Sequence, residues 1–189
     1  NVIFIQLEGI DNWLVKKDIM PTLYSLQDNA INFTNHYSFY NGGGSTFNSE
    51  FAVNTGFITP LSFNRNAYTF NRNDFTYSLA NLFKNEKYNV NAFHMNSREY
   101  YSRGINYENW GYDNYFGLKD MEIYLNDSYQ LDRELILNEN FYDLMFNQEE
   151  KFLHYIITYS NHMPFSTKAG VCKQLLNEDL ENNLIFKTD

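Results

Sequence analysis

The chain has 189 residues and a formal net charge of −9, because 23 Asp and Glu residues outnumber 14 Lys and Arg residues. This charge, together with the lack of any lysine or arginine cluster, excludes nucleic acid as the partner and disfavours direct binding to anionic lipid. Aromatic residues make up 19% of the chain, which is typical of a folded protein of one domain rather than of a disordered segment.

The cysteine content and the start of the chain restrict the class of protein further. The single cysteine, Cys172, excludes an intramolecular disulfide and a Cys-x-x-Cys motif, and we expect a partly buried structural residue there. No apolar run approaches the ~18 residues that a membrane helix needs. The chain starts inside a strand-like pattern and not with Met. We therefore expect a piece of a longer protein, whose membrane attachment lies in a segment absent here.

The first half of the chain alternates between strand-like and helix-like patterns. The opening run NVIFIQLE is short, apolar and β-branched, which favours a buried strand that ends in the carboxylate of Glu8. Pro21 fits the first turn of a helix. The elements expected are, in order, a strand at 1–8, a helix at 20–30, a strand at 31–40, a glycine-rich break at 41–45, a helix at 46–57 and an irregular surface loop at 59–74.

The second half continues this alternation. Apolar residues at helical spacing predict an amphipathic helix after the loop, and the run KFLHYIITYS predicts another buried strand. The elements expected are a helix at 75–88, a strand at 89–95, a helical turn running into a loop at 97–116, a weakly patterned stretch at 118–131, a helix at 138–146, a strand at 151–160 and a polar tail. This order predicts a single α/β domain over 1–189, with a mostly parallel central sheet flanked by helices.

In such sheets, functional groups gather beyond the carboxyl ends of the strands. The places to which this rule points are Glu8, the loop leading to Thr46, the segment 94–96 and the segment 160–162. Glu8 is either an exposed acid or a metal ligand, since a carboxylate after an apolar strand is costly unless it is exposed, paired or bound to a metal. Each of these places offers a different chemical group.

Thr46 lies where a glycine-rich loop enters a helix, and free N–H groups at a helix start suit a phosphoryl group. It is either a simple N-cap, which Ser49 and Glu50 would support, or a reactive hydroxyl held by the same backbone. The loop is not a Walker loop, because no Lys follows the glycines.

The other candidates are basic and aromatic. Arg98 and Arg103 follow His94 and Asn96 closely, and Arg grips a phosphate through parallel N–H bonds, although one of the two arginines is expected to be a solvated helix charge. His162 is either a polar loop residue or a ligand. We favour structural roles for His36 and His154, which lie in strand-like runs, and core or rim positions for Trp13 and Trp110. Asp113 and Asp132 could be ligands in principle, but no spacing singles them out.

Taken together, these segments resemble a known family. NVIFIQLEG, GGGSTFNSEF, FHMNSREYYSRG followed by GYDNYF, and SNHMPF are similar, in order and spacing, to the motifs of the lipoteichoic acid synthase family. That family belongs to the alkaline phosphatase and sulfatase superfamily. The resemblance runs from Asn1 to about Phe165, and its strongest element is T-x-x-S-E-F after glycines, with L-E upstream.

The resemblance implies a reaction. Glu8 and Thr46 would coordinate a divalent metal, with Mn²⁺ expected and Mg²⁺ or Zn²⁺ as alternatives. Thr46 would attack the phosphorus of phosphatidylglycerol, release diacylglycerol and pass the glycerophosphate to a teichoic acid acceptor. His162 and Arg103 would bind the glycerophosphate. The substrate-binding residues also include His94, Asn96, which takes the place of an acid, and Tyr101, which takes the place of a Trp.

The resemblance also implies a location and a boundary. The enzyme would act on the extracellular face of a bacterial cell membrane. The family's remaining metal ligands are an Asp-His pair in a G-D-H-G-like motif that this sequence lacks, so we expect a domain truncated at its C-terminus.

Rival functions stay open at this point. Residues 46–48 offer no C/S-x-P-x-R motif, which makes sulfate ester hydrolysis an unlikely activity. A phosphoethanolamine transferase, a phosphodiesterase and a non-catalytic glycerophosphate-binding module remain as alternatives.

Overall fold

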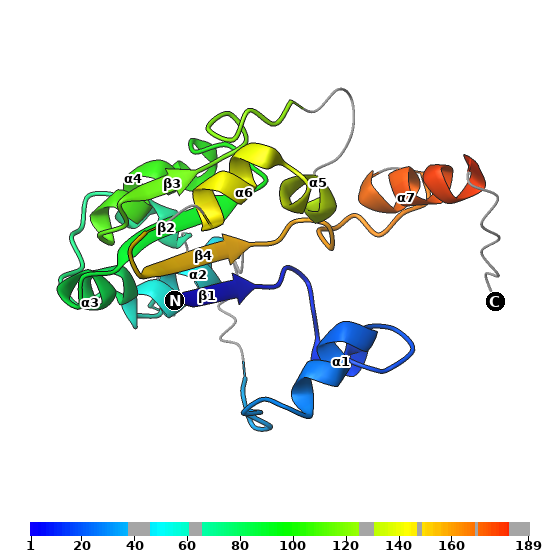
Figure 1. The fold of residues 1–189 in the computed structure, drawn as a ribbon, viewed down its shortest axis with the longest axis horizontal. Helices are drawn as coiled ribbons and strands as arrows, with labels where there is room; N and C mark the ends of the chain where they lie inside the picture. Colours follow the sequence, from blue (N-terminus) through cyan, green and yellow to red (C-terminus); the bar gives the residue numbers. More distant parts are fainter. Residues whose placement is uncertain (38–45, 61–65, 125–130, 147–148, 169, 182–189) are drawn as a thin grey trace.

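The computed structural model describes residues 1–37, 46–60, 66–124, 131–146, 149–168 and 170–181. Within these residues the centre is a sheet of parallel strands in the order β1-β4-β2-β3. The strands are β1 (Val2–Gln6), β2 (Asn89–His94), β3 (Asn114–Phe116) and β4 (Phe152–Ile157). The predicted α/β class with a mostly parallel sheet is confirmed, and Figure 1 shows the strands side by side between helices.

Two layers of helices cover the sheet, while other helices lie apart from it (Figure 1). The α-helices are α1 (Pro21–Gln27), α2 (Thr46–Thr55), α3 (Leu79–Asn85), α4 (Arg103–Asn109), α5 (Asp132–Ile136), α6 (Glu139–Phe146) and α7 (Gly170–Glu181). The short 3-10 helices are η1 (Asn12–Leu14), η2 (Ala67–Phe70) and η3 (Tyr100–Ser102). The layer with α2 and α4 packs on one face of the sheet, and α5 and α6 pack on the other, while α1 and α7 lie apart from the sheet (Figure 1).

The two inner strands bury side chains on both faces, as expected of a parallel sheet covered by helices. In β4, Tyr155 belongs to the core under α2 and α4, whereas Ile156 belongs to the core under α6. Every residue of β4 is buried. This rigid centre fixes the positions of the loops that follow β2 and β4.

The edge strand β1 differs from the prediction in its burial. The strand forms where expected, but Ile3, Phe4 and Ile5 are 45%, 38% and 53% exposed. In the part of the chain that the structure describes, β1 pairs with β4 alone. At this edge of the sheet, the side chains of β1 have less cover than those of the inner strands.

One predicted strand is wrong over its described part. Residues 31–37 form no strand, and Ile31, Phe33 and Tyr37 are 80–85% exposed. Alternating apolar residues make a strand only where a neighbouring strand offers hydrogen-bonding partners, and none lies beside this segment among the described residues. Residues 38–40 of this prediction and the glycine-rich break at 41–45 lie outside the described residues.

Two other segments are more ordered than predicted. The stretch 97–116, expected as a helical turn and loop, contains η3, α4 and β3. The expected surface loop at 59–74 contains η2, whose Ala67 is fully buried, while its residues 61–65 lie outside the described residues. In the first segment the order comes from the packing of Trp110 on Phe47 and from the pairing of β3 with β2, and in the second from the packing of Tyr68 on Phe47.

Candidate active site

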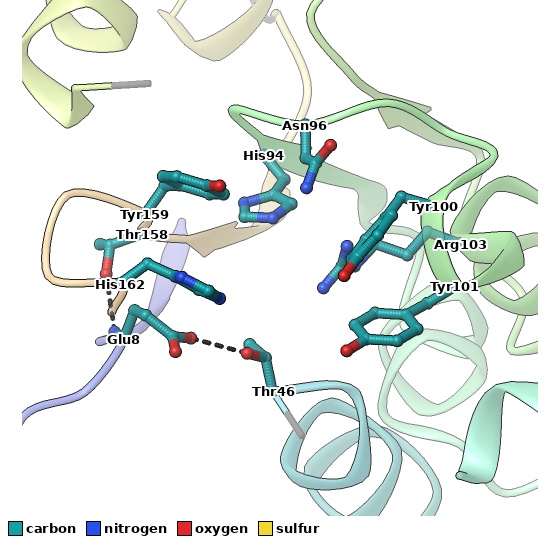
Figure 2. Close-up of a pocket in the computed structure, with 10 residues that line it drawn as sticks. All are labelled: Glu8, Thr46, His94, Asn96, Tyr100, Tyr101, Arg103, Thr158, Tyr159 and His162. Carbon is teal, nitrogen blue, oxygen red and sulfur yellow. Dashed lines mark hydrogen bonds between the residues drawn. The ribbon is translucent and has the colours of Figure 1, made fainter. Parts of the chain in front are cut away.

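One pocket of about 230 Å³ gathers every residue that the sequence proposed for the site. It lies at the carboxyl ends of β1, β2 and β4, where the strand-end rule places functional groups. Figure 2 shows the side chains converging on it. The lining residues are Glu8, Thr46, His94, Asn96, Tyr100, Tyr101, Arg103, Thr158, Tyr159 and His162.

Glu8 and Thr46 form what we call the reactive pair. The Thr46 hydroxyl donates a hydrogen bond of 2.8 Å to Oε2 of Glu8, although 38 residues separate the two (Figure 2). Both side chains are partly exposed and face the pocket. The exposed-acid interpretation of Glu8 is therefore too simple, because its carboxylate is held against a hydroxyl.

Backbone contacts place Glu8 with little help from its side chain. The Glu8 N–H donates to Oγ1 of Thr158, the first residue after β4, over 2.8 Å. The next residue, Gly9, has φ +59, and a Cβ there would lie 2.7 Å from the carbonyl oxygen of Asn161. Only glycine tolerates that conformation at such close approach. The ends of β1 and β4 are thus tied together beside the pocket.

Thr46 is the first described residue of α2 and lies at the helix start that the glycine-rich sequence predicted. The Gln6 amide donates to the Thr46 carbonyl oxygen over 3.4 Å and accepts a bond of 2.5 Å from the Tyr155 hydroxyl. The proposed support of a cap by Glu50 is wrong, because its side chain turns into the core, where an arginine takes its carboxylate. Ser49 is exposed, and its support of the cap stays a prediction.

The wall of the pocket opposite Glu8 and Thr46 contains Arg103, which belongs to a buried cluster of Glu50, Arg103 and Tyr107. We call this cluster the anchor. Arg103 donates to Glu50 through Nε, at 3.2 and 3.0 Å, and through Nη2, at 2.7 Å. The Tyr107 hydroxyl donates to the second carboxylate oxygen over 3.0 Å. Arg103 is 1% exposed and Glu50 is 0% exposed, so this is a fully buried ion pair. Arg98, by contrast, is a surface charge next to Asp120, as one of the two arginines was expected to be.

The turn before Arg103 has an unusual backbone. Tyr101 and Ser102 both adopt left-handed conformations, with φ of +58 and +48. Such residues cost about 1–2 kcal/mol each and are common at functional sites. The turn stacks the Tyr101 ring on Tyr68 and sets it 5.1 Å from the Arg103 guanidinium. The strain therefore supports an aromatic wall beside the cation.

His94 faces the pocket as a neutral base. Burial, and then the nearby positive charge of Arg103, lower the pKa of His94 to about 3. Its Nδ1 lies 2.9 Å from the Ile157 carbonyl oxygen, which only accepts, so the proton is on Nδ1. The other ring nitrogen, Nε2, is left as a hydrogen-bond acceptor for a ligand.

Asn96 and His162 complete the lining. The Asn96 Oδ1 accepts from the Ser97 N–H over 2.8 Å, which turns its Nδ2 amide toward the pocket in Figure 2. The His162 ring stacks on Tyr159, with centroids 5.2 Å apart, and points into the pocket (Figure 2). Its Nδ1 lies 2.6 Å from the Met163 carbonyl oxygen. Asn96 is thus a donor and His162 presents its Nε2.

The residues given structural roles lie away from the pocket. His154 is fully buried and contacts the sulfur of Met145 over 3.1 Å. The Asp132 carboxylate accepts from the N–H groups of Tyr159 and Ser160, so it holds the loop after β4. Asp113 accepts from the Val90 N–H and pairs with a lysine. The structural role predicted for His154 is thus confirmed, and Trp110 lies in the core, one of the two places expected for it. Asp113 and Asp132, which the sequence left open as possible ligands, hold the backbone instead.

His36 and Trp13 need a correction or a refinement. His36 was placed in a strand, yet it is exposed in a turn. Trp13 is 62% exposed and so belongs to the surface rather than to the core. Cys172 is a partly buried free thiol, as expected.

The sequence did not single out several residues that the structure brings to the site. Tyr100, Thr158 and Tyr159 line the pocket, and Glu50 supports it from behind. Thr158 and Tyr159 lie directly at the end of β4, so the strand-end rule could have included them. The role of Glu50 had no sequence signal, because its partner Arg103 is 53 residues away.

The oxygen atoms of the reactive pair suit a hard divalent cation. Glu8 and Thr46 can supply two ligands, and a metal ion takes four or more. No cluster of three or more His, Cys, Asp or Glu side chains in the described ranges could hold an ion by itself. The two residues therefore fit part of a metal site, and further ligands must come from water, substrate or other protein groups.

The fold and the pocket together define the class of protein. A hydroxyl at a helix start and a strand-end carboxylate face a buried arginine across the carboxyl edge of a parallel sheet. This arrangement suits group transfer at an anionic phosphoryl or related centre. It also matches the expectation, from the motifs, of an alkaline phosphatase-like domain.

Comparisons with known proteins identify the family. The model of the sulfatase family matches residues 1–178, so the chain belongs to the sulfatase family, within the alkaline phosphatase superfamily. Proteins of this superfamily include hydrolases and transferases that use divalent metals.

A curated relative and two solved structures are similar to the chain. The lipoteichoic acid synthase-like protein YvgJ of Bacillus subtilis is 26% identical over 173 residues, covering 87% of this chain and 27% of YvgJ. The crystal structure of the lipoteichoic acid synthase LtaP from Listeria monocytogenes matches with a TM-score of 0.69 at 27% identity, over 88% of this chain and 42% of that one.

The second structure supports the fold alone. A Vibrio parahaemolyticus protein of the alkaline phosphatase superfamily matches with a TM-score of 0.65 at 19% identity, over 88% of this chain and 41% of that one. The chain thus spans about a quarter of the length of YvgJ and less than half of the two structures. Among the described residues, no helix has the length and apolar character needed to cross a membrane.

Proposed function

We propose that this protein is a divalent-metal-dependent phosphoglycerol transferase. It moves glycerophosphate from a phosphatidylglycerol-type lipid to a teichoic acid-type acceptor through a threonine-linked intermediate. The observation that carries the proposal is the 2.8 Å bond between the Thr46 hydroxyl and Glu8, set in the pocket opposite Arg103. The similarity to YvgJ and LtaP supports the choice of substrate class.

Thr46 acts as the nucleophile. Its oxygen forms a bond to phosphorus, the bond from phosphorus to the diacylglycerol oxygen breaks, and the diacylglycerol takes up a proton. The Thr46 proton is directed at Glu8 in the structure, so the carboxylate is its nearest acceptor. In the second half, an acceptor hydroxyl attacks the same phosphorus, the bond from phosphorus to the Thr46 oxygen breaks, and the proton lost by the acceptor hydroxyl restores the Thr46 hydroxyl. A hydroxyl at a helix start suits both steps, because its backbone is fixed.

Glu8 and Thr46 would hold the metal ion, with Mn²⁺ as the expected ion and Mg²⁺ or Zn²⁺ as alternatives. When bound, the ion lowers the pKa of the hydroxyl and neutralises charge on the transferring group.

The opposite wall binds the glycerophosphate. Arg103 and the Nε2 of His162 face the phosphoryl oxygens, while the neutral Nε2 of His94 accepts from a glycerol hydroxyl and Asn96 donates to one. Tyr101 packs beside Arg103 and limits the pocket. Glu8 is the one carboxylate among the described lining residues, so an ammonium head group finds no second acid there. This favours glycerol over ethanolamine.

The proposal also covers location and partners. The likeness to lipoteichoic acid synthases supports action at the extracellular face of a bacterial membrane, where lipid and acceptor are both available. The net charge of −9 requires that the lipid head group be recognised locally in the pocket and not by a broad basic surface.

Turnover of labelled phosphatidylglycerol tests the reaction. The full chain with added Mn²⁺ is expected to release diacylglycerol, and Thr46→Ala is expected to lower the rate at least about 1,000-fold, because it removes the bond-forming atom. Ser49→Ala, which removes an exposed hydroxyl one turn further along α2, is the control and keeps the rate. Equal rates in the wild type and Thr46→Ala would remove Thr46 from its role.

A second candidate is a non-catalytic glycerophosphate-binding module. It is favoured by one observation, namely that the described segments contain no group of three or more His, Cys, Asp or Glu side chains that could hold a metal ion. Metal analysis of the purified full chain separates the two. About one tightly bound ion per chain supports the transferase, and no bound ion together with glycerophosphate binding supports the module.

A further inference from the structure

Arg103 meets the pocket with one edge of its guanidinium, while Glu50 holds the opposite edge. We propose that Glu50 is a positioning residue, which strengthens the binding of a phosphoryl anion by fixing the orientation of Arg103. The proposal deepens the function given above and rests on it.

A guanidinium group offers two edges for paired hydrogen bonds. In Arg103 the edge formed by Nε and Nη2 is occupied by the Glu50 carboxylate, with contacts of 2.7–3.2 Å. The end of the group carries Nη1, which is buried and has no hydrogen-bond partner in the described part of the chain. Figure 2 shows this nitrogen end directed into the pocket, between His94 and Thr46. The unoccupied edge therefore faces the place of a ligand.

The surroundings leave Arg103 little freedom to turn. Its guanidinium lies 5.1 Å from the Tyr101 ring and 5.9 Å from the Phe47 ring. The second Glu50 oxygen accepts from Tyr107, whose pKa is raised well above its ordinary value, first by burial and then by Glu50, so the phenol stays a donor. Glu50 is thus held by a third residue while it holds Arg103.

The charge balance supports the same conclusion. Burial lowers the pKa of Arg103, but the adjacent Glu50 carboxylate outweighs burial and raises the pKa, so the side chain stays a cation. An ion pair that served stability alone gains nothing from a buried N–H without a partner, which costs free energy. A phosphoryl oxygen in the pocket would supply that partner.

A double-mutant cycle tests whether Glu50 acts through Arg103. Binding of sn-glycerol 3-phosphate to the full chain is measured by calorimetry for the wild type, Glu50→Gln, Arg103→Lys and the double variant. Glu50→Gln keeps the shape of the side chain but weakens its hydrogen bonds to the Arg103 guanidinium. We therefore expect the affinity for sn-glycerol 3-phosphate to fall about 10-fold to 100-fold. The double variant is expected to bind no more weakly than Arg103→Lys alone, because coupled residues are not additive.

Controls separate positioning from folding and from charge. Glu108→Gln removes the same charge from the exposed side of α4, and we expect it to bind as the wild type does. If Glu50→Gln does not fold, as judged by thermal melting, Glu50→Asp replaces it in the cycle, because it keeps the charge and shortens the reach. Additive losses of affinity in a folded set overturn the proposal.

The turnover assay distinguishes the proposed transfer reaction from the proposed positioning role of Glu50. Binding with the expected coupling but without release of diacylglycerol supports the positioning role and overturns the transfer reaction. Release of diacylglycerol with additive losses supports the reaction and overturns the positioning role. A wild-type chain that neither binds the probe nor turns over the lipid overturns both.

Discussion

The two walls of the pocket are held in opposite ways. The reactive pair, Glu8 and Thr46, is partly exposed, and one hydrogen bond joins its side chains while backbone contacts set its place. The anchor of Glu50, Arg103 and Tyr107 is buried and fully interconnected through the carboxylate. In the proposed reaction, Thr46 must exchange partners, whereas Arg103 must keep one orientation to bind the phosphoryl group. The difference predicts which substitutions cost stability and which cost activity alone.

The largest expected effect on stability is at the anchor. Glu50→Ala leaves the Arg103 charge buried without a partner, and we expect a loss of about 3–5 kcal/mol in the free energy of unfolding. Glu8→Ala removes a partly exposed carboxylate from the other wall, and we expect a loss below about 1 kcal/mol. Urea unfolding of the two variants gives both values. Similar losses would show that the two walls are not held differently.

The next effect depends on pH and involves His94, which lies between the walls, and His154 in the core. Burial lowers the pKa of His94 to about 3 and of His154 to about 4, from an ordinary value of 6.5. Below pH 6.5 the unfolded chain therefore takes up protons that the folded chain does not bind, and the free energy of unfolding falls as the pH falls. Lowering the pH from 7.5 to 5.0 is expected to cost about 2 kcal/mol for each histidine.

A substitution shows how much of this loss of stability is due to His94. Between pH 7.5 and 5.0, the free energy of unfolding of His94→Gln is expected to fall by about 2 kcal/mol less than that of the wild type, as measured by urea unfolding at each pH. His36→Gln serves as the control, since His36 is exposed and its removal leaves the pH dependence as it was. A His94→Gln curve parallel to that of the wild type would show that His94 is protonated in the folded state.

A smaller difference in stability is expected between the substitutions of two glycines, one of which lies in the reactive wall. Gly9 and Gly56 both have positive φ, of +59 and +75, but a Cβ at Gly9 meets Asn161 whereas one at Gly56 meets nothing within 4 Å. Replacement by Ala costs about 1 kcal/mol at either site for the backbone, and the contact adds about 1–2 kcal/mol at Gly9. Thermal melting measures the difference. Lipid turnover is expected to fall in Gly9→Ala alone, because Glu8 is its neighbour.

The smallest effect is expected at Thr158, whose hydroxyl accepts from the Glu8 N–H. Thr158→Val keeps the shape of the side chain and removes the acceptor, which lowers the free energy of unfolding by about 1 kcal/mol. Because Glu8 is then held less firmly, lipid turnover is expected to slow several-fold. Thr158→Ser keeps the acceptor and is expected to retain both stability and rate. Equal behaviour of the Val and Ser variants would show that this bond does not position Glu8.

The alternation of strands and helices, and the strand ends that carry Glu8, His94 and His162, followed from the sequence because they depend on local periodicity and on the geometry common to all parallel sheets. Thr46 was identifiable because glycines before a helix start are a local pattern. The order β1-β4-β2-β3, which brings Glu8 next to Thr158, depends on contacts between residues about 150 positions apart.

Tertiary structure alone decided the rest. The segment 31–37 carries a strand pattern but has no strand beside it, and 114–116 became a strand because β2 lies next to it. The pairing of Glu50 with Arg103 has no signature in the sequence of either segment, because a buried charge selects whichever opposite charge the folded chain brings within reach. The sequence therefore determined which groups are available, and packing determined which of them are fixed and which can react.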